Sequence, residues 1–579
     1  MDGITYADPI DISNIFNDYY INVIKNNSQG IVTPQIVKNM LKVKNEDPPL
    51  FKPFFTFTPV KEVEIENIIH SFKNKFSTGY DDVPIQVLKA ASKQLRTVLA
   101  HLVNSSFVSG IFPNQLKISK VTPIYKKEDK KNLANYRPIS LLPTLSKVYE
   151  RIVYNQLLNY LESYNLIDDI QHGFRKGRSV TSAAVNFLQL IIDSVDKGDY
   201  TIGIFMDLSK AFDSVEHSLL LEILYNLGIK NNTLDWFSSY LTNRLQQVEI
   251  KQTVNNKKFK ISSCRKVVKF GVPQGSILGP LLFICYLRNI GQMFSYIPKN
   301  CLCLYADDSN LKISGDTLHQ IEILSQIELS NIKTYLENLN LKLNLKKTSY
   351  MVFKTQQSKI INEPNIIIDQ QKITRNTSTN FLGLLVDENL TWDLHIDKLL
   401  KKLNSGVYVL SKMVFLKDSA TLRMIYFAHI HSHISFGLSL YGSTKKSNLD
   451  KILKIQKKCV RIIMKLDYNA STRKHFTELK VLTIYAQYIF DTIILVKQEQ
   501  NLNRLQRHSY NTRQINNIVQ SHHRLKFYEK KPTFNGLKFL KYIPSIIQNE
   551  KNFKSFNKKL KQFLINNPVY SFEEFCNLE

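Results

Sequence analysis

Cysteine is scarce in this sequence, and no apolar stretch is long enough to cross a membrane. The six cysteines among the 579 residues are Cys264, Cys285, Cys301, Cys303, Cys459 and Cys576. They show no paired zinc-binding spacing, so we expect reduced core residues and exclude a zinc-knuckle RNA chaperone. The start, Met1–Thr5, lacks a basic leader, and no internal repeat is visible. We therefore expect a soluble, intracellular protein without membrane association, and not a solenoid.

Acidic residues are outnumbered by basic ones. The chain has 77 Lys and Arg against 49 Asp and Glu, a net charge of +28, and a hydrophobic fraction of 43% that excludes a disordered chain. The length predicts several domains with a large core. The charge points to a polyanion, because basic residues bind nucleic acid through counterion release. A basic protein can also simply be soluble or adsorb to a membrane surface.

Two adjacent acids interrupt an apolar hairpin pattern at Tyr305–Asp308. Cys301–Leu304 precedes them and Leu311–Ile313 follows, and both runs are typical of buried strands. Burying an unpaired carboxylate is costly, so Asp307 and Asp308 need either a neutralising cation or a turn that leaves them in water. Asp-Asp-Ser-Asn is also ordinary turn chemistry, and the motif alone leaves both alternatives open.

Another acid ends a second apolar strand upstream. Thr201–Met206 is typical of a buried strand, and Asp207 follows it directly. Three carboxylates brought together form a hard oxygen cage whose charge suits two divalent ions, and Mg²⁺ rather than a soft metal. Two such ions, roughly 3.5–4 Å apart, activate an attacking hydroxyl and stabilise the leaving oxygen of an in-line phosphoryl transfer.

A loop rich in glycine and proline, Phe270–Pro280, lies between the two acidic motifs. Glycine lets a backbone approach a ligand closely, and Gln274 can offer its amide to that ligand. On its own, the pattern is more typical of a loop before a core helix.

In this order the three segments resemble the palm motifs of reverse transcriptases: Asp207, Pro273–Gly275 and Tyr305–Asp308 each match. The likeness covers most of the chain and is closest to the polymerases of jockey-type non-LTR retrotransposons. The further matching segments are Ser77–Pro84, Pro123–Lys126, Asn135–Leu142, Gln171–Ser179, Leu343–Thr348, Phe381–Asp387 and Phe436–Ser443.

The resemblance implies an α+β fold of the right-hand polymerase type, with fingers, palm and thumb and a mostly helical C-terminal region. Together with breaks in the hydrophobic pattern, it divides the chain into four parts. These are an N-terminal connector at 1–75, fingers and palm at 76–386, a thumb-like helical region at 387–497 and a basic tail at 498–579.

The resemblance also implies a metal site. Asp207, Asp307 and Asp308 are expected to hold two Mg²⁺ ions, with Mn²⁺ as the alternative metal. Asp207 and Asp307 would contact both ions, and Asp308 would contact them less directly. Leu208, the residue after Asp207, would lend its backbone carbonyl.

A nucleotide pocket is implied beside the metal site. Lys126 and Arg137 resemble the fingers residues that hold the triphosphate, as a point charge and a bidentate fork respectively. Phe212 stands at the position of the steric gate, whose ring rejects a 2′-hydroxyl, and Gln274 would contact the same dNTP. Lys347 would protonate the leaving pyrophosphate as a general acid. The alternatives are solvated charge for the basic residues and core packing for Phe212.

The last third of the chain, from Asp387 to Glu579, carries 32 Lys and Arg against 15 Asp and Glu, a net of +17. Five basic residues there recur at steps of three and four, which predicts one basic face of an amphipathic helix. Like charges at this spacing repel one another, so we expect the face to grip template RNA; a solvated helix face is the alternative. The five are Lys451, Lys454, Lys458, Arg461 and Lys465, and the apolar side is Leu449, Ile452, Leu453, Val460 and Ile463.

The resemblance therefore implies an RNA-directed DNA polymerase of the cytoplasm and nucleus, with an RNA template, a DNA primer or target and dNTPs as partners. Jockey-type elements usually carry an endonuclease ahead of the polymerase. Residues 1–75 are too few for one, so the nicking activity is expected from a separate protein. A catalytically inactive nucleic-acid-binding relic and an RNA-binding protein like the intron maturases remain as alternatives, and the intact set of acids favours the enzyme.

Overall fold

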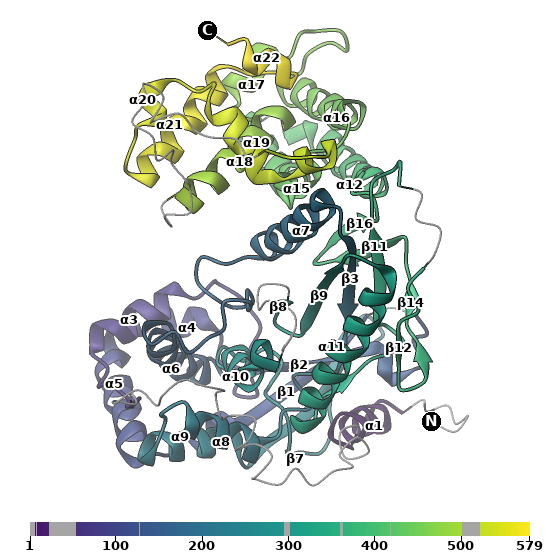
Figure 1. The fold of residues 1–579 in the computed structure, drawn as a ribbon. Coiled ribbons are helices and arrows are strands. Elements are labelled where there is room, and N and C mark those ends of the chain that lie inside the picture. The colour runs from purple at the N-terminus through teal and green to yellow at the C-terminus, as the bar shows by residue number, and fades with distance from the viewer. Residues whose placement is uncertain are drawn as a thin grey trace. The chain divides into compact units, whose positions relative to one another are not determined.

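The computed structural model of the protein describes residues 6, 8–22, 54–126, 128–293, 302–358, 363–416, 418–500 and 522–578. The chain divides into two compact units. Unit one comprises Met1–Arg178, Met206–Ser309 and Ile327–Lys347, and unit two comprises Ser179–Phe205, Asn310–Gln326 and Thr348–Glu579. Both units combine helices with strands (Figure 1), which confirms the predicted α+β class.

Unit one is built on a sheet with the strand order β2-β1-β5-β6, in which β7 also pairs with β5. β1 is antiparallel to β2 and parallel to β5, and both β6 and β7 are antiparallel to β5. The register sets Arg137 opposite Ile124, and Lys126 N donates to Asn135 O at 2.8 Å just beyond the ladder. Lys126 and Arg137 therefore come from neighbouring strand ends. The strands are β1 (Ile118–Tyr125), β2 (Tyr136–Leu141), β5 (Arg244–Val254), β6 (Lys257–Ser262) and β7 (Lys266–Val268).

Helix α1 (Pro9–Asn22) packs against this sheet. Phe16 joins Val121 and Val248 in a buried apolar cluster. Asn17 donates through Nδ2 to the Cys264 carbonyl at 2.8 Å and accepts from Gln246 Nε2 at 2.9 Å. Buried polar groups of a helix that are satisfied by the sheet make the helix part of its core. The N-terminal segment, expected as a connector, thus contributes a structural element to unit one.

The helices of unit one surround an aromatic core. Trp236 is fully buried, stacks on Tyr240 with ring centroids 5.6 Å apart, and donates its Nε1–H to Ser106 Oγ at 2.9 Å. Glu150 on α6 accepts from the backbone N–H groups of Ile277 and Leu278 at 2.6 and 3.3 Å, which anchors the chain just ahead of α10. The helices are α3 (Glu62–Ser71), α4 (Ile85–Ala90), α5 (Ser92–Ser109), α6 (Thr144–Ser163), α8 (His217–Asn226), α9 (Asn231–Leu241) and α10 (Gly279–Tyr286).

A second sheet has the strand order β14-β11-β3-β9-β8, and the division between the units runs through β3 and β9. β3 (Tyr200–Met206) is buried beyond its first residue and pairs antiparallel with β11 (Ser349–Phe353), which confirms the predicted strand at Thr201–Met206. The remaining strands are β8 (Leu302–Tyr305), β9 (Asp308–Gly315) and β14 (Thr374–Arg375).

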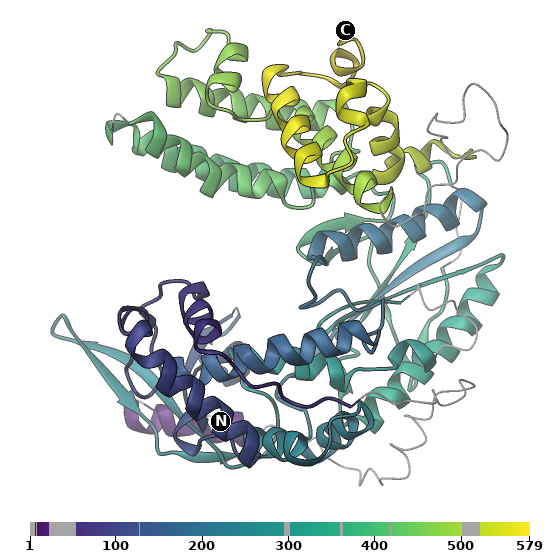
Figure 2. The ribbon, with the colours of Figure 1, turned by 90° about the vertical axis from the view of Figure 1, so that its left-hand side faces the viewer.

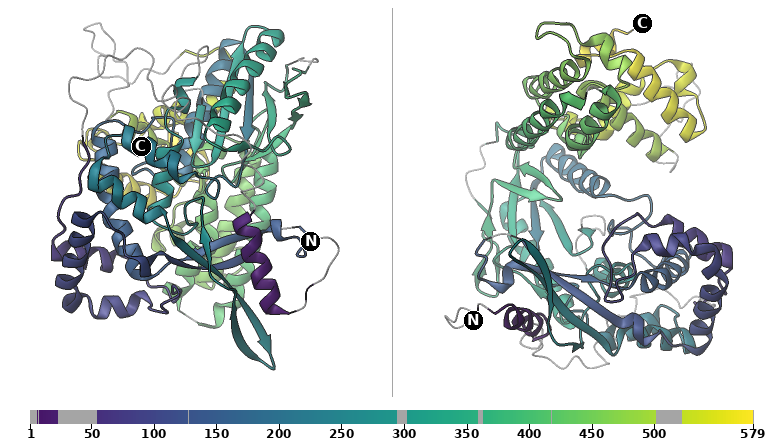
Figure 3. Two further views of the ribbon diagram at one scale, coloured as in Figure 1. Left: turned by 90° about the horizontal axis from the view of Figure 1, so that it is seen from below. Right: turned by 180° about the vertical axis from the view of Figure 1, so that it is seen from behind.

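The C-terminal helices of unit two share one core. α19 and α21 pack against α18 (Figures 2 and 3, yellow and green), and a side chain at Gly536 would place its Cβ 2.3 Å from the Thr492 carbonyl oxygen. The predicted boundary between 497 and 498 falls within α18. No helix in the described ranges is long and apolar enough to cross a membrane. The main helices are α7 (Val180–Lys197), α12 (Asp393–Lys412), α13 (Ser419–Tyr426), α16 (Lys446–Met464), α18 (Ile484–Gln500), α19 (Pro532–Leu540) and α21 (Phe553–Asn566).

The five cysteines among the described residues are free. Cys285, Cys303 and Cys459 are buried in α10, β8 and α16, as expected for core residues. The expectation is wrong for Cys264, which is exposed because it lies in the loop between β6 and β7, where its backbone rather than its thiol holds α1. Cys301 lies outside the described residues.

A buried acid in α18 gives unit two a pH-dependent stability. Burial raises the pKa of Asp491 to about 7, although Gln487 Nε2 donates to its carboxylate at 2.8 Å and Lys561 contributes a positive charge. An unfolded aspartate ionises near pH 4, so between about pH 4 and 7 the folded state binds more protons than the unfolded state. The free energy of unfolding should therefore fall over this window, by up to about 4 kcal/mol, and stay constant above it.

Replacing Asp491 with Asn should remove this loss. Relative to the native chain, Asp491→Asn should raise the melting temperature more at pH 8 than at pH 5, because only at pH 8 does the native side chain carry its buried charge. Thermal unfolding of both chains at the two pH values measures the difference. An equal shift at both pH values would contradict the assignment.

Candidate active site

Asp307 and Asp308 lie at the turn between β8 and β9, which confirms the predicted hairpin. Ala306, with φ 58°, supplies the left-handed residue that reverses the chain. Gln171 Oε1 accepts from Ala306 N at 3.1 Å and from Gly173 N at 2.8 Å, which fixes the turn. A Cβ at Gly173 would lie 2.5 Å from Ala306 N, so only glycine permits this approach.

Asp207 follows β3 and is held by the segment after α11 (Leu318–Asn338). Asn344 N donates to the Asp207 backbone carbonyl at 2.9 Å, next to the pairing of β4 (Leu208–Ser209) with β10 (Lys342–Leu343). The Asp207 carboxylate accepts from Lys347 Nζ at 3.0 Å and from Asn344 Nδ2 at 3.4 Å. Lys347 is therefore at the site and ion-paired with Asp207.

The carboxylates lack sufficient counter-charge. Burial, and then the charge of Asp207, raises the pKa of Asp307, an effect that Arg137 and Lys126 partly offset. Burial together with the charges of Asp307 and Asp207 raises the pKa of Asp308 to about 6. Each of these carboxylates makes ionisation of the others less favourable, and a bound divalent cation would relieve that repulsion. Their oxygen atoms are also the hard ligands that Mg²⁺ and similar ions prefer.

The three acids do not form a three-ligand cage in this structure. In the part of the chain that the structure describes, no group of three or more His, Cys, Asp or Glu side chains is arranged to hold a metal ion. Asp207 and Asp307 line the same cavity, whereas Asp308, at the start of β9, does not line it.

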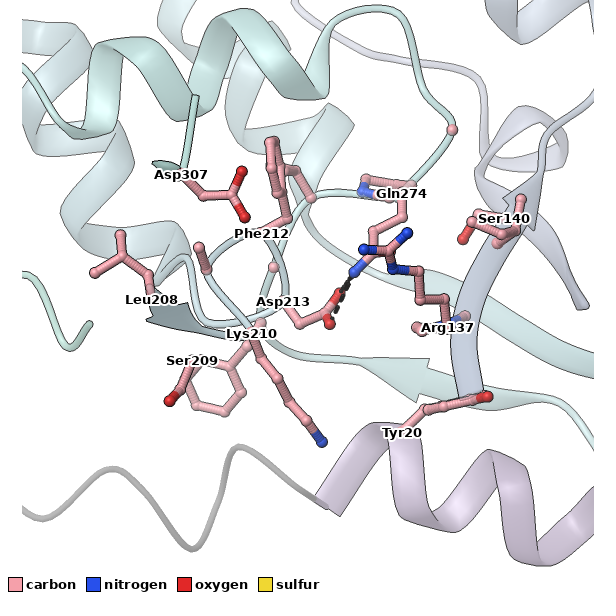
Figure 4. A pocket seen from close by; sticks show the side chains of 18 of the residues that line it. Tyr20, Arg137, Ser140, Leu208, Ser209, Lys210, Phe212, Asp213, Gln274 and Asp307 are labelled. Carbon is pink, nitrogen blue, oxygen red and sulfur yellow. Dashed lines mark hydrogen bonds between the residues drawn. The ribbon is translucent and has the colours of Figure 1, made fainter. Parts of the chain in front are cut away.

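The cavity lies within unit one and has a volume of about 750 Å³. It brings together residues from the β1–β2 strand ends, the turn after β3, the glycine-rich loop and the β8–β9 turn (Figure 4). The sequence-predicted site residues that line it are Lys126, Arg137, Asp207, Leu208, Phe212, Gln274, Asp307 and Lys347.

The glycine-rich loop is fixed at both ends. Val272 N donates to the Phe212 carbonyl at 2.9 Å, and Ser140 N on β2 donates to the Gln274 carbonyl at 2.8 Å. The Phe212 ring is half-buried in the cavity wall, with its centroid 4.5 Å from that of Phe283. The loop thus holds both Phe212 and Gln274 in place.

Asp213 is a cavity residue that sequence reasoning missed. Gln274 Nε2 lies 2.8 and 2.9 Å from its two carboxylate oxygens (Figure 4). Burial raises the pKa of Asp213 to about 6, against the opposing effects of this hydrogen bond and of Lys210. In this structure the nitrogen of the Gln274 amide donates to Asp213, and contact of Gln274 with a ligand stays a prediction. The sequence does show a second acid in the segment after Asp207. The distance between the two acids along the chain does not reveal, however, which loop Asp213 contacts.

Two tyrosines of α1 also line the cavity and gave no signal in the sequence. The Tyr19 hydroxyl accepts from Lys210 Nζ at 3.0 Å. The buried Tyr20 hydroxyl has no hydrogen-bond partner among the described residues. Nothing in the spacing between α1 and the palm motifs indicates this contact, because it results from how α1 packs on the sheet.

In unit two, the basic stripe lies mostly on α16. Its predicted apolar side is confirmed, because Leu449, Ile452, Leu453, Val460 and Ile463 are all buried. Lys451, Lys454 and Lys458 are exposed. Arg461 Nε donates to the Ala470 carbonyl at 3.1 Å. The prediction is wrong for Lys465, which caps the helix in the left-handed region at φ 54° and does not continue its face.

Comparisons with known proteins agree with this geometry. Residues 125–386 match the family described as reverse transcriptase (RNA-dependent DNA polymerase). The chain is 27% identical over 444 residues to the probable RNA-directed DNA polymerase from transposon BS of Drosophila melanogaster, covering 74% of this chain and 48% of that protein. It is 26% identical over 478 residues to the RNA-directed DNA polymerase from mobile element jockey of the same species, covering 79% and 50%. It thus spans about half the length of these curated relatives.

Among solved structures, the RNA-dependent RNA polymerase of a human picorbirnavirus aligns with a TM-score of 0.43 and 11% identity, covering 80% of this chain and 77% of that chain. The described residues form an α+β fold, and unit one brings carboxylates and basic side chains to one cavity. Residues 125–386 thus match a reverse transcriptase domain, and over most of its length the chain is similar to the RNA-directed DNA polymerases of jockey and related retrotransposons. As a family, these polymerases use divalent metal ions.

Proposed function

We propose that this chain is an RNA-directed DNA polymerase that extends a DNA primer on an RNA template with dNTPs. The observation that carries the proposal is one cavity in which Asp207 and Asp307 face the basic residues Lys126 and Arg137. Acids for a divalent cation beside donors for a triphosphate are the two halves of a nucleotidyl-transfer site.

In the proposed reaction the primer 3′-hydroxyl attacks the α-phosphate of a dNTP and pyrophosphate leaves. Asp207 and Asp307, with the backbone carbonyl of Leu208, would hold two divalent ions, Mg²⁺ or Mn²⁺, and Asp308 would add its charge. When bound, such ions activate the hydroxyl and stabilise the leaving oxygen. Lys347, 3.0 Å from Asp207, balances that carboxylate and is the proposed proton donor to pyrophosphate.

The remaining cavity residues would position the nucleotide. Lys126 and Arg137 would bind the triphosphate by charge and by a bidentate fork. Much of the catalysis would then come from holding the reactants in line, because correct positioning removes most of the entropic cost of the encounter. The separate endonuclease and the location in cytoplasm and nucleus stay predictions.

Primer extension tests the function directly. Purified chain, an RNA template with an annealed DNA primer, dNTPs and Mg²⁺ should yield extended primer, and chelation of the metal should stop the reaction. Retained RNA binding without extension in either Mg²⁺ or Mn²⁺ would instead support an inactive nucleic-acid-binding relic.

The steric gate gives a separate prediction on sugar choice. If the Phe212 ring lies against the sugar, Phe212→Val should raise the use of ribonucleotides relative to dNTPs by about tenfold or more, with the dNTP reaction retained. Competing-substrate assays measure the ratio. Phe76→Val makes the same change at a ring that is 90% exposed and should leave the ratio unaltered. If the ratio of ribonucleotide to dNTP use is unchanged in Phe212→Val, the Phe212 ring only packs in the core and does not select the sugar.

A further inference from the structure

The outer part of strand β5 forms a two-stranded ribbon with β6. β5 pairs with β1 only as far as Val248, and Glu249–Val254 pair with β6 alone among the described residues. Asn255 and Asn256, with φ 48° and 58°, form the two-residue turn at the tip. Figures 2 and 3 show this hairpin (teal) projecting from the sheet of unit one as an arm. Residues 255–260 are all exposed, so the tip is open to a partner.

The ribbon is basic and has no acid beyond its base. Ile250–Ser262 contains four lysines and no aspartate or glutamate. The register sets Lys251 directly opposite Lys260. Like charges opposite each other on one sheet face destabilise the strand pairing, and a polyanion beside the ribbon would relieve that repulsion.

The lysines lie on both faces of the ribbon. Because side chains alternate along a strand, Lys258 and Lys260 share the face of Lys251. Lys257 lies on the opposite face. Lys260 Nζ is 4.0 Å from Asp82 Oδ1, so this lysine has an acidic neighbour. None of the other three lysines forms an ion pair with a described acid, and they leave positive charge on both sides of the tip.

A thin ribbon with charge on both faces fits a groove between two phosphate backbones. Neighbouring strands lie about 4.7–4.9 Å apart, and the major groove of B-form DNA, about 12 Å wide, admits a two-stranded ribbon. The major groove of A-form RNA is too deep and narrow for side chains to read. A single strand has one backbone and would meet one face only. Shape and charge therefore favour duplex DNA over RNA.

We propose that the β5–β6 hairpin binds duplex DNA in its major groove, with Lys251 and Lys258 facing one phosphate backbone and Lys257 facing the other. None of these lysines lines the active-site cavity, so the duplex site is separate from the site of nucleotide addition. The inference goes beyond the proposed polymerase activity and does not depend on it, because DNA binding is measured without dNTPs.

Protection of a sheet edge is the structural alternative. β6 is an edge strand among the described residues, and lysines on an edge strand hinder pairing with another chain. If the lysines serve only this purpose, their removal should make the chain self-associate and leave its affinity for DNA unaltered. Sedimentation of the native and variant chains measures self-association.

DNA affinity across a salt series tests the site. The ribbon variant changes Lys251, Lys257 and Lys258 together to Gln. On a B-form DNA duplex it should lose about 2 to 3 in the slope of log affinity against log salt, at roughly 0.9 for each lost phosphate contact. Its affinity should fall roughly 10- to 100-fold near 0.1 M salt. Binding to an RNA duplex of the same sequence should stay near the native value.

Two further variants separate the ribbon from bulk charge and from side-chain effects. Changing Lys61, Lys73 and Lys93, which are exposed elsewhere in unit one, to Gln alters the net charge equally and should leave the DNA slope near the native value. A shortened hairpin lacks the last two residue pairs before the turn, so that the turn lies between Gln252 and Phe259. It should lose about 2 in slope, because two of the three lysines are removed, and thermal unfolding verifies that it is folded.

The groove is tested on the native chain. Methylation of guanine N7, which lies in the major groove, should lower the affinity for the duplex, and a ligand that fills the minor groove should not. The reverse pattern would overturn the major-groove assignment.

Three results would overturn the DNA site itself: a native salt slope in the ribbon variant, an equal loss in the control variant, or an equal loss on duplex RNA. Absence of primer extension by a native chain that binds DNA as described would count against the polymerase function and not against this site.

Discussion

Asp207→Asn and Asp307→Asn should each abolish nucleotide incorporation while leaving RNA binding largely intact. Both side chains line the cavity, and the charge of Asp207 raises the pKa of Asp307, so the two acids act on one small volume. Asparagine keeps the shape but removes the charge that would hold a divalent ion. A loss of about 4 kcal/mol of transition-state stabilisation corresponds to roughly a thousandfold lower rate.

The rate of single-nucleotide incorporation at saturating dNTP and Mg²⁺ measures this effect, and thermal unfolding of each variant verifies that the chain is still folded. Asp316→Asn, just beyond the other end of β9, makes the same change at an exposed acid and should behave as the native chain does. Extension at the native rate by either active-site variant would remove these two acids from the metal site.

The strands that carry the acids could be predicted from the sequence, because each is an unbroken apolar run that is followed by an aspartate. β3 and the β8–β9 hairpin lie where the pattern predicts them, with Asp207 and Asp307 just beyond strand ends. Their meeting in one cavity does not follow from local pattern. Asp207 and Lys347 are 140 positions apart, and only the resemblance to reverse transcriptases brought them together in advance.

The contacts missed by sequence reasoning are those created by packing. Asp213 follows an aromatic residue in an ordinary turn, and its partner Gln274 lies 61 positions away on a loop whose path depends on Ser140 and Gly271. Tyr20 reaches the cavity because α1 packs on β5, a contact that no periodicity indicates. Long-range polar contacts of this kind depend on tertiary structure, which propensity and spacing do not encode.

The end of helix α16 was also not predictable from the sequence. The three-and-four spacing of the basic stripe continues through Lys465, yet α16 ends at Met464 because the backbone turns left-handed there without a glycine. Arg461, one turn earlier, directs its guanidinium to the Ala470 carbonyl beyond the helix. Both residues therefore help to end the helix, and the part of the stripe that is free to meet a phosphate backbone is narrower than the sequence predicts.

Replacing Lys451, Lys454 and Lys458 together with Gln should weaken RNA binding and reduce its salt dependence. These three residues are exposed on α16, whereas the opposite side of the helix is buried, so the charge is lost without touching the core. Each lost phosphate contact lowers the slope of log affinity against log salt by roughly 0.7–0.9. The triple variant should therefore lose about 2 to 3 in slope and roughly 10- to 100-fold in affinity near 0.1 M salt.

A matched triple variant separates the stripe from bulk charge. Lys554, Lys558 and Lys561 are exposed at a similar spacing on α21 of the same unit, so changing them to Gln alters the net charge equally. If α16 contacts the template, the α16 variant should lose far more slope than the α21 variant, and its incorporation rate at saturating template should stay near the native value. If the slope of log affinity against log salt is the same for the α16 variant and the native chain, the basic stripe faces solvent and does not contact RNA. Equal losses in the two variants would mean that RNA responds to the charge of the whole C-terminal region, because screening makes distant charges act only through the overall field.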